Sequence, residues 1–173
     1  MKKYLTTFFI FLVLCMFTAS CYSDEASEWY SKGVSYYDNG LYGKAIECFN
    51  ESIRLNPNNP NAYYGRGQAY FDTYSLEEAI SDFTKVIKSV PNFSGAYFLR
   101  GKSYNELKDF ESAISDYSKA IELDPENAEY YLNRGMLYRN NSEIYGLDEA
   151  EKDYRKACEL GDNYACNRLR SFY

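Results

Sequence analysis

The sequence predicts an all-α protein, a solenoid of repeated helix pairs closed by a short helix at its carboxyl end. The first observation is a fixed period. Glycine recurs every 34 residues, at Gly33, Gly67, Gly101 and Gly135. Alanine and proline recur at the same interval, at Ala45, Ala79 and Ala113 and at Pro57, Pro91 and Pro125. A period of this length is typical of stacked arrays, in which each unit buries its apolar face against its neighbours.

The second observation is the spacing of apolar residues inside each repeat. Ala45, Ile46, Phe49 and Ile53 follow the three-and-four spacing of an amphipathic helix. In the first repeat we expect one helix over about residues 27–39 and a second over about residues 42–55. The second helix should end before its proline, because the residue that precedes a proline is pushed out of the helical region.

The repeated glycine lies inside the first helix of each pair. Glycine costs about 1 kcal/mol relative to alanine in a helix interior. A chain that keeps glycine at this site in every repeat needs the space that a side chain would fill.

The recurring residues resemble the tetratricopeptide repeat, whose pattern is W-x2-L-G-x2-Y, then A-x3-F, then P. In the third repeat the matching residues are Tyr97, Gly101, Tyr104, Ala113, Tyr117 and Pro125. The leucine of the pattern is Lys or Arg in every copy. The resemblance implies a right-handed α-solenoid of helix-turn-helix repeats over residues 26–59, 60–93, 94–127 and 128–161. It also implies that each glycine faces the alanine of its pair, as Gly67 would face Ala79 and Gly101 would face Ala113.

Two further sets of residues recur with the repeat. The tyrosines three residues after each glycine are expected to pack in the core: Tyr36, Tyr70, Tyr104 and Tyr138. The arginines before the glycines are Arg66, Arg100 and Arg134. In related repeats this position is half-buried and paired with an acid, so the resemblance implies a structural role for them.

The fourth repeat departs from the pattern. Its alanine, Ala150, comes about three residues late, so the loop over residues 140–146 should be longer than its counterparts. Asp148–Leu160 should form the second helix of the fourth repeat. Gly161 should end this helix, and Asp162 should cap the helix that follows. A capping helix within residues 162–173 would cover the apolar end of the array with Ala165, Leu169 and Phe172.

The carboxyl end is similar to Sel1-like repeats, including cysteine-rich bacterial ones, in which a Cys-x7-Cys pair bridges consecutive helices. The resemblance implies a disulfide between Cys158 and Cys166, which an exported protein can form in an oxidising compartment. The alternative is two reduced, packed cysteines. Cys48 has no predicted partner.

Residues 1–20 resemble a lipoprotein signal peptide. Two lysines precede an apolar run too short to span a bilayer, and small residues then precede Cys21. This order is similar to a bacterial lipobox, although Thr18 departs from the usual leucine. The resemblance implies acylation (palmitate) at Cys21, a tether over residues 21–25, and a protein lipid-anchored in the bacterial cell envelope, at the outer membrane or periplasmic face. An ordinary secretory signal and an uncleaved anchor are the alternatives.

The composition excludes several classes of function. The 173-residue chain has a net charge of −6 and no histidine, and removal of residues 1–20 takes away two lysines and no acid. An acidic chain lacks the clustered Lys and Arg that nucleic acids require. We find no catalytic constellation, phosphate-binding glycine loop or metal-ligand cluster, so the sequence predicts no enzyme, no cofactor and no metal.

What remains is a binding surface. In tetratricopeptide arrays the first helices line a concave groove, and aromatic side chains there suit peptide anchors. The resemblance places the peptide-binding groove at Tyr30, Tyr37, Tyr64, Gln68, Phe71, Phe98, Lys102 and Asn105. Further positions on the same face are Val34, Leu132, Met136 and Arg139. The alternative is that several of these side chains pack between neighbouring helices.

One family activity does not carry over. Co-chaperone members grip a C-terminal carboxylate with a clamp of Lys, Asn and Arg. The matching positions here are Tyr30, Val34, Gly65, Gly95 and Leu99. The expected function is therefore non-enzymatic protein or peptide binding, as a scaffold in the cell envelope. The alternative is an accessory lipoprotein of a transporter that holds a small hydrophobic ligand in the groove, which a deep closed pocket would favour.

Overall fold

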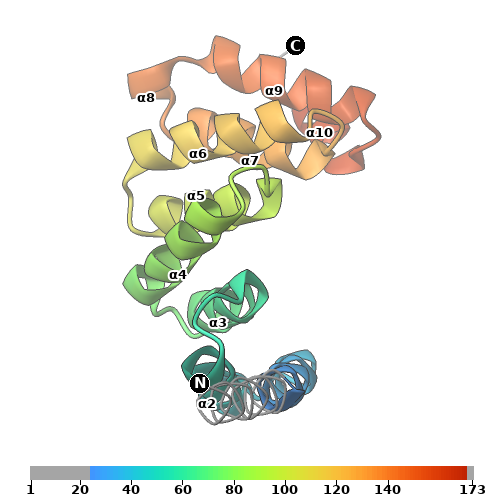
Figure 1. Ribbon diagram of the computed structural model, residues 1–173. Helices are drawn as coiled ribbons and strands as arrows, with labels where there is room; N and C mark the ends of the chain where they lie inside the picture. Colours follow the sequence, from blue (N-terminus) through green and yellow to red (C-terminus); the bar gives the residue numbers. More distant parts are fainter. Residues whose placement is uncertain (1–23, 171–173) are drawn as a thin grey trace, which may run out of the picture. The chain divides into compact units, whose positions relative to one another are not determined.

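The computed structural model describes residues 24–170, and its regular elements in that range are helices (Figure 1). Residues 24–38 are helical. They are followed by α2 (Tyr42–Leu55), α3 (Pro60–Asp72), α4 (Leu76–Ser89), α5 (Ser94–Glu106), α6 (Phe110–Leu123), α7 (Ala128–Asn140), α8 (Ser142–Tyr145), α9 (Leu147–Glu159) and α10 (Asn163–Leu169). Neighbouring helices pack together, and α5 with α6 and α7 with α9 do so most extensively. The predicted all-α fold of repeated helix pairs is confirmed.

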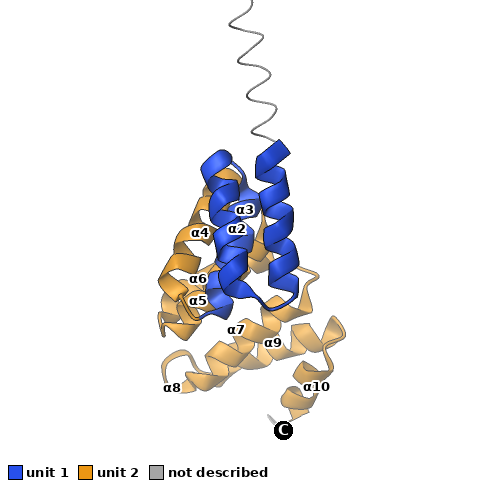
Figure 2. Ribbon diagram, turned by 90° about the horizontal axis from the view of Figure 1, so that it is seen from below, with its two compact units in different colours: residues 1–73 blue, residues 74–173 orange. Residues whose placement is uncertain are grey.

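The chain divides into two compact units, coloured separately in Figure 2. The amino-terminal unit ends at Thr73 and contains the helical residues 24–38, α2 and α3. The carboxy-terminal unit begins at Tyr74 and contains α4 to α10. The predicted signal peptide, the lipidation site Cys21 and the predicted capping residue Phe172 lie outside the described residues.

The second helix of each of the first three repeats ends where its proline led us to expect. α2 ends at Leu55, α4 at Ser89 and α6 at Leu123, each two residues before a proline. An asparagine side chain then caps α3 and α7, because Asn59 and Asn127 accept a hydrogen bond from the backbone N–H two residues on. Such caps satisfy amide groups that the first turn of a helix leaves without a partner.

Gly33 and Gly101 lie in close contact with an aromatic ring on the second helix of their pair. A Cβ added at Gly101 would lie 2.9 Å from Cδ1 of Tyr117 and 3.3 Å from the carbonyl oxygen of Ala113. A Cβ at Gly33 would lie 2.7 Å from the ring of Phe49. At Gly101 the expected partner, Ala113, is met through its backbone carbonyl. The ring needs the space that the glycine leaves.

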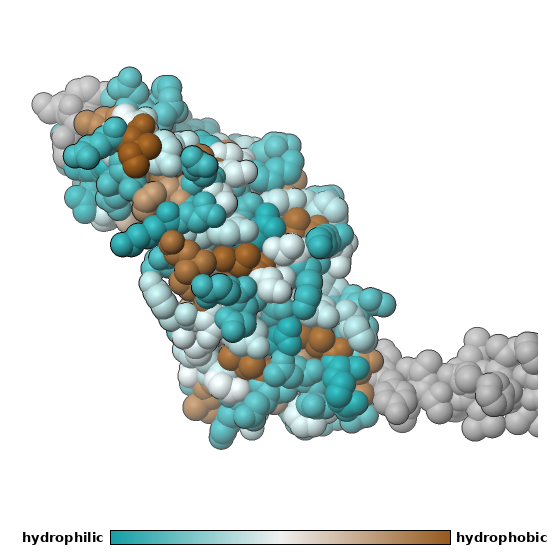
Figure 3. Space-filling model, turned by 90° about the vertical axis from the view of Figure 1, so that its left-hand side faces the viewer, coloured by the Kyte–Doolittle hydropathy of each residue, from teal (hydrophilic) through white to brown (hydrophobic). Residues whose placement is uncertain are grey.

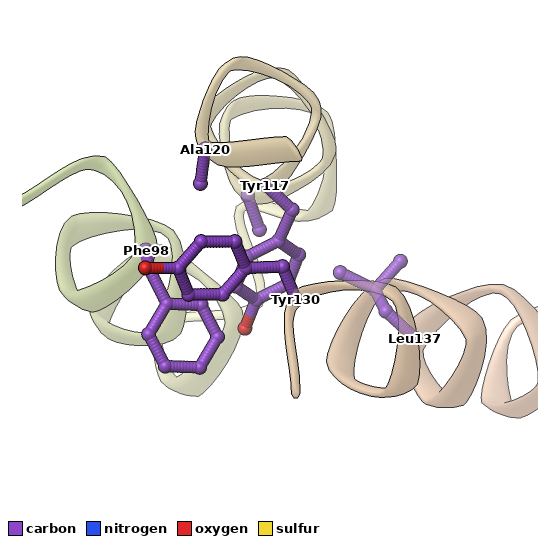
Figure 4. Packing of buried hydrophobic residues seen from close by; sticks show 6 residues of the cluster. Phe98, Tyr117, Ala120, Tyr130 and Leu137 are labelled. Atoms are coloured by element: carbon purple, nitrogen blue, oxygen red, sulfur yellow. The ribbon is translucent and has the colours of Figure 1, made fainter. Parts of the chain in front are cut away.

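Aromatic side chains from three helices form the core of the carboxy-terminal unit. The Phe98 ring on α5 lies 5.8 Å from that of Tyr117 on α6 and 4.7 Å from that of Tyr130 on α7, between ring centroids (Figure 4). Leu137 and Ala120 complete this cluster. Within it, Tyr104 and Phe110 pack at the edge and are partly buried.

Two arginines join neighbouring helices in the carboxy-terminal unit. Arg100 donates two hydrogen bonds to the carboxylate of Asp116, at 2.7 and 2.8 Å, and a third to Thr84 at 3.0 Å. Arg134 repeats the arrangement with Asp153 on α9, at 2.8 Å for both bonds, and with Ser118 on α6. The hydrogen bond from Arg100 to Asp116 raises the pKa of the guanidinium. The structural role expected of this position is confirmed at both residues.

The carboxyl end is built as the sequence predicted, with one difference. The long loop of the fourth repeat contains a short helix, α8, before Gly146. Asp162 caps α10 by accepting a hydrogen bond from the amide of Ala165 at 2.6 Å. Ala165 and Leu169 pack against the buried face of α9. The sulfur atoms of Cys158 and Cys166 lie at bonding distance, 1.94 Å, and link α9 to α10.

Candidate peptide-binding groove

One face of the amino-terminal unit gathers predicted groove residues around a cavity. On the first described helix, Tyr30, Val34, Tyr37 and Asp38 share a face, because residues four, seven and eight apart lie above one another on a helix. Side chains from α2 and α3 complete a cavity of about 280 Å³. It is lined by Tyr30, Val34, Tyr37, Asp38, Phe49, Tyr64, Gly65 and Gln68. Five of these were expected in the groove from the sequence: Tyr30, Val34, Tyr37, Tyr64 and Gln68.

The cavity has an aromatic floor that the groove prediction did not include. Phe49 on α2 is 1% exposed, and its ring lies 5.9 Å from that of Tyr30. Gly65 on α3 lets this ring approach, since a Cβ there would lie 2.6 Å from Cζ of Phe49. Gly65 does not recur with the repeat, because Ser31 and Leu99 stand at the equivalent positions. A glycine that appears in only one repeat is the sequence signal that marks this cavity.

Tyr37 is held in place at the edge of the cavity. Its hydroxyl donates a hydrogen bond to Oδ2 of Asp72 at 2.6 Å, and its ring lies 5.5 Å from that of Tyr42. Burial raises the pKa of Tyr37 above its ordinary value, and the bond to Asp72 raises it further. The phenol therefore stays neutral, and with its only proton directed at Asp72 its oxygen can act only as an acceptor toward a ligand.

Phe98 corrects the predicted groove. It is 5% exposed and belongs to the core cluster between α5, α6 and α7. Tyr130 covers it, and stands where earlier repeats carry Ala62 and Ala96. Phe98 therefore offers almost no surface to a ligand, and the alternative of packing between helices applies to it.

The other predicted groove residues are half-buried. Phe71 lies on α3 of the amino-terminal unit. Lys102 and Asn105 lie on α5 of the carboxy-terminal unit. The Lys102 ammonium sits 5.6 Å from the centroid of the Phe98 ring, within reach of a cation–π attraction.

A second, larger cavity of about 630 Å³ lies on a different face of the same unit and contains no predicted groove residue. It is lined by Trp29, Lys32, Tyr36, Lys44, Glu47, Cys48, Asn50 and Glu51. Burial raises the pKa of the Cys48 thiol, and the Lys32 charge opposes that shift. Lys32 and Cys48 occupy the repeat positions that hold the Arg100–Asp116 pair in the third repeat.

Two features that would indicate another function are absent from residues 24–170. In that range no cluster of three or more His, Cys, Asp or Glu side chains could hold a metal ion. The same residues include no helix whose length and apolar character would allow it to cross a membrane. On the face shown in Figure 3, exposed apolar side chains form separate groups divided by polar ones.

Comparison with protein families identifies the repeat. One family model, described as TPR repeat, matches residues 33–73 and 101–142, and a second, described as tetratricopeptide repeat, matches residues 60–93. Together the matches span more than half of the chain. A comparison with curated protein sequences found no match.

Solved structures of similar fold are tetratricopeptide proteins. A crystal structure of MamA is 27% identical with a TM-score of 0.75, and the match covers 82% of this chain and 81% of that one. MamA 41-end from Desulfovibrio magneticus RS-1 is 25% identical with a TM-score of 0.74, over 79% and 75%. The first TPR of Spaghetti (RPAP3), bound to the HSP90 peptide SRMEEVD, is 28% identical with a TM-score of 0.67, over 69% and 95%. The chain belongs to the tetratricopeptide repeat family.

Proposed function

We propose that this protein is a non-enzymatic binding protein that holds a peptide segment of a partner protein, and that a lipid on Cys21 anchors it in the bacterial cell envelope. The observation that carries the binding function is the convergence of Tyr30, Tyr37, Tyr64 and Gln68 on one cavity. Two helices of rigid aromatic side chains around a concave surface suit the anchoring of peptide side chains.

The comparison with the RPAP3 domain supports a peptide as the ligand, since that domain is seen with a bound peptide. Its acidic HSP90 peptide is not the ligand we propose here. The family's carboxylate clamp would need basic or amide side chains where this chain has Tyr30, Val34 and Gly65, and these three residues line the cavity instead.

A small hydrophobic ligand, as for an accessory protein of a transporter, is not favoured. Pockets for small molecules usually enclose about 300–1,000 Å³ and are mostly apolar. The groove cavity is smaller, at about 280 Å³, and Asp38 and Gln68 are among its lining residues.

Selection from a random peptide library tests the binding function. The full chain, held in detergent micelles, should enrich peptides whose affinity is then measured by fluorescence anisotropy. The double variant Tyr37→Ala/Tyr64→Ala should bind them at least tenfold more weakly, because it removes two aromatic walls of the cavity. Tyr164→Ala, at an exposed tyrosine on α10, should bind as the unaltered protein does. Failure to enrich any peptide, or equal binding by a folded double variant, would contradict the proposal.

The anchor has its own test. In the bacterium, the unaltered protein should fractionate with membranes and incorporate a labelled palmitate analogue. Cys21→Ala should lose the label and leave the membrane fraction, because two or three acyl chains supply the anchoring energy. A Cys21→Ala protein that still sediments with membranes and keeps the label would overturn this part of the proposal.

A further inference from the structure

The groove cavity carries a negative charge among its aromatic rings. Asp38 lines it beside Tyr30, Tyr37 and Tyr64, and its eight lining residues include no Lys or Arg. Asp38 is exposed, and its carboxylate forms no ion pair with another side chain in residues 24–170. A carboxylate at the mouth of a cavity attracts a cation more strongly than it would in open water, because protein replaces part of the surrounding solvent.

The basic side chains of residues 24–73 lie elsewhere. Lys32 and Lys44 line the second cavity. Arg54 donates to Glu51, and Arg66 donates to Asn50. None of the four is among the residues that line the groove cavity, and the charged residue in that lining is Asp38. A second carboxylate, that of Asp72, accepts the hydrogen bond from the Tyr37 hydroxyl at the edge of the cavity and adds a negative charge there.

The rings supply the other half of cation recognition. The face of an aromatic ring carries negative potential and attracts an ammonium or guanidinium group within about 6 Å of its centre. Three tyrosines, Tyr30, Tyr37 and Tyr64, line this space. The Tyr37 oxygen can only accept, since its proton is directed at Asp72, and an accepting oxygen suits the N–H donors of Lys and Arg.

We propose that this cavity is the subsite for one basic side chain, lysine or arginine, of the bound peptide. The inference rests on the peptide-binding function proposed above and adds the charge of the partner. The volume of about 280 Å³ suits a single side chain, whose ammonium or guanidinium group would meet Asp38 while its methylenes lie against Tyr30 and Tyr64.

The test uses peptides enriched from the random library on the full chain. We expect a shared Lys or Arg among them. Replacing that residue by norleucine, which keeps the methylenes and removes the charge, should raise Kd about tenfold. Asp38→Asn should raise the Kd of the basic peptide several-fold. Glu47→Gln is the matched control, because it makes the same change of charge in the second cavity and should leave Kd unchanged.

A double-mutant cycle locates the contact. In the Asp38→Asn protein, the norleucine replacement should cost less than in the unaltered protein, because the two changes remove the same interaction. Enriched peptides without a basic residue, or equal weakening by Asp38→Asn and Glu47→Gln, would overturn the subsite and leave peptide binding intact. A library that yields no binding peptide would instead overturn the function on which the subsite rests.

Discussion

Three turn residues share one backbone conformation with different side chains. Gly40, Tyr74 and Lys108 stand 34 residues apart, each between the two helices of a repeat, and each has a positive φ, of 72°, 63° and 63°. The left-handed region costs an ordinary residue about 1–2 kcal/mol, because its Cβ crowds the following carbonyl oxygen. Of these three repeats, the first avoids the strain by using glycine.

Substitution at Gly40 isolates this strain. A Cβ there would meet nothing within 4 Å, so Gly40→Ala should destabilise the protein by about 1 kcal/mol through the backbone alone. Gly43→Ala is the matched control, since that Cβ is equally free and Gly43 lies in the first turn of α2. It should stabilise by up to about 1 kcal/mol, because alanine favours the helix. Urea unfolding measures both, and changes of the same sign would contradict the prediction.

The arginine–aspartate ion pairs join different helices. Arg134 on α7 reaches Asp153 on α9 and Ser118 on α6, so one side chain ties three helices together. Its side chain is 18% exposed and that of Asp153 is 5% exposed. Removing one partner of such a pair leaves a charge partly buried without compensation, which costs more than the intact pair contributes.

Asp153→Ala should therefore lower the free energy of unfolding by about 3 kcal/mol. The double variant Arg134→Met/Asp153→Leu should recover much of that loss, because no charge is left behind. Glu122→Ala, which breaks an exposed pair with Lys119, serves as the control and should leave the urea midpoint nearly unchanged. A double variant no more stable than Asp153→Ala would rule out this explanation.

The stability of the carboxy-terminal helix α10 depends on the Cys158–Cys166 disulfide. α10 has seven residues, too few to be stable alone, and contacts α9 through Ala165 and Leu169. Closing the short loop between Cys158 and Cys166 should contribute about 2–3 kcal/mol. Reduction should expose the α10 amides to hydrogen exchange while those of α5 and α6 stay protected. Alkylation of both thiols in denaturant without reductant would show that the bond does not form.

At the scale of the whole molecule, the buried tyrosines predict how stability depends on pH. Burial raises the pKa of Tyr117, as it does that of Tyr37. An unfolded tyrosine ionises near pH 10, so above that pH the unfolded state loses protons first. The stability from these groups is complete below pH 10 and is lost as pH rises toward their folded pKa values.

The urea midpoint should therefore fall between pH 9 and pH 11, as it would for any protein with raised tyrosine pKa values. Tyr117→Phe keeps the buried ring and removes the ionisable group, so its midpoint should fall less steeply over the same range. Tyr164→Phe, at an exposed tyrosine, should follow the unaltered protein. Parallel curves for all three proteins would contradict the prediction.

Much of the fold follows from the sequence because it depends on local chemistry. The end of α2 at Leu55 follows from Pro57, and the cap of α10 follows from Gly161 and Asp162. The groove was predicted less fully. Asp38 and Phe49 were missed, because the repeat pattern assigns one to a helix end and the other to the core.

The helix pairs, their ends, the small residues between them and the cysteine pair can all be predicted from the sequence, since each depends on a periodic or adjacent pattern. Which of the predicted groove aromatics are exposed depends instead on tertiary packing. Tyr30, Tyr64 and Phe98 occupy one repeat position, yet Phe98 alone is buried. The reason is the volume of its neighbours: Tyr130 covers Phe98, whereas the small residues Ala62 and Ala96 stand at the equivalent positions of the earlier repeats.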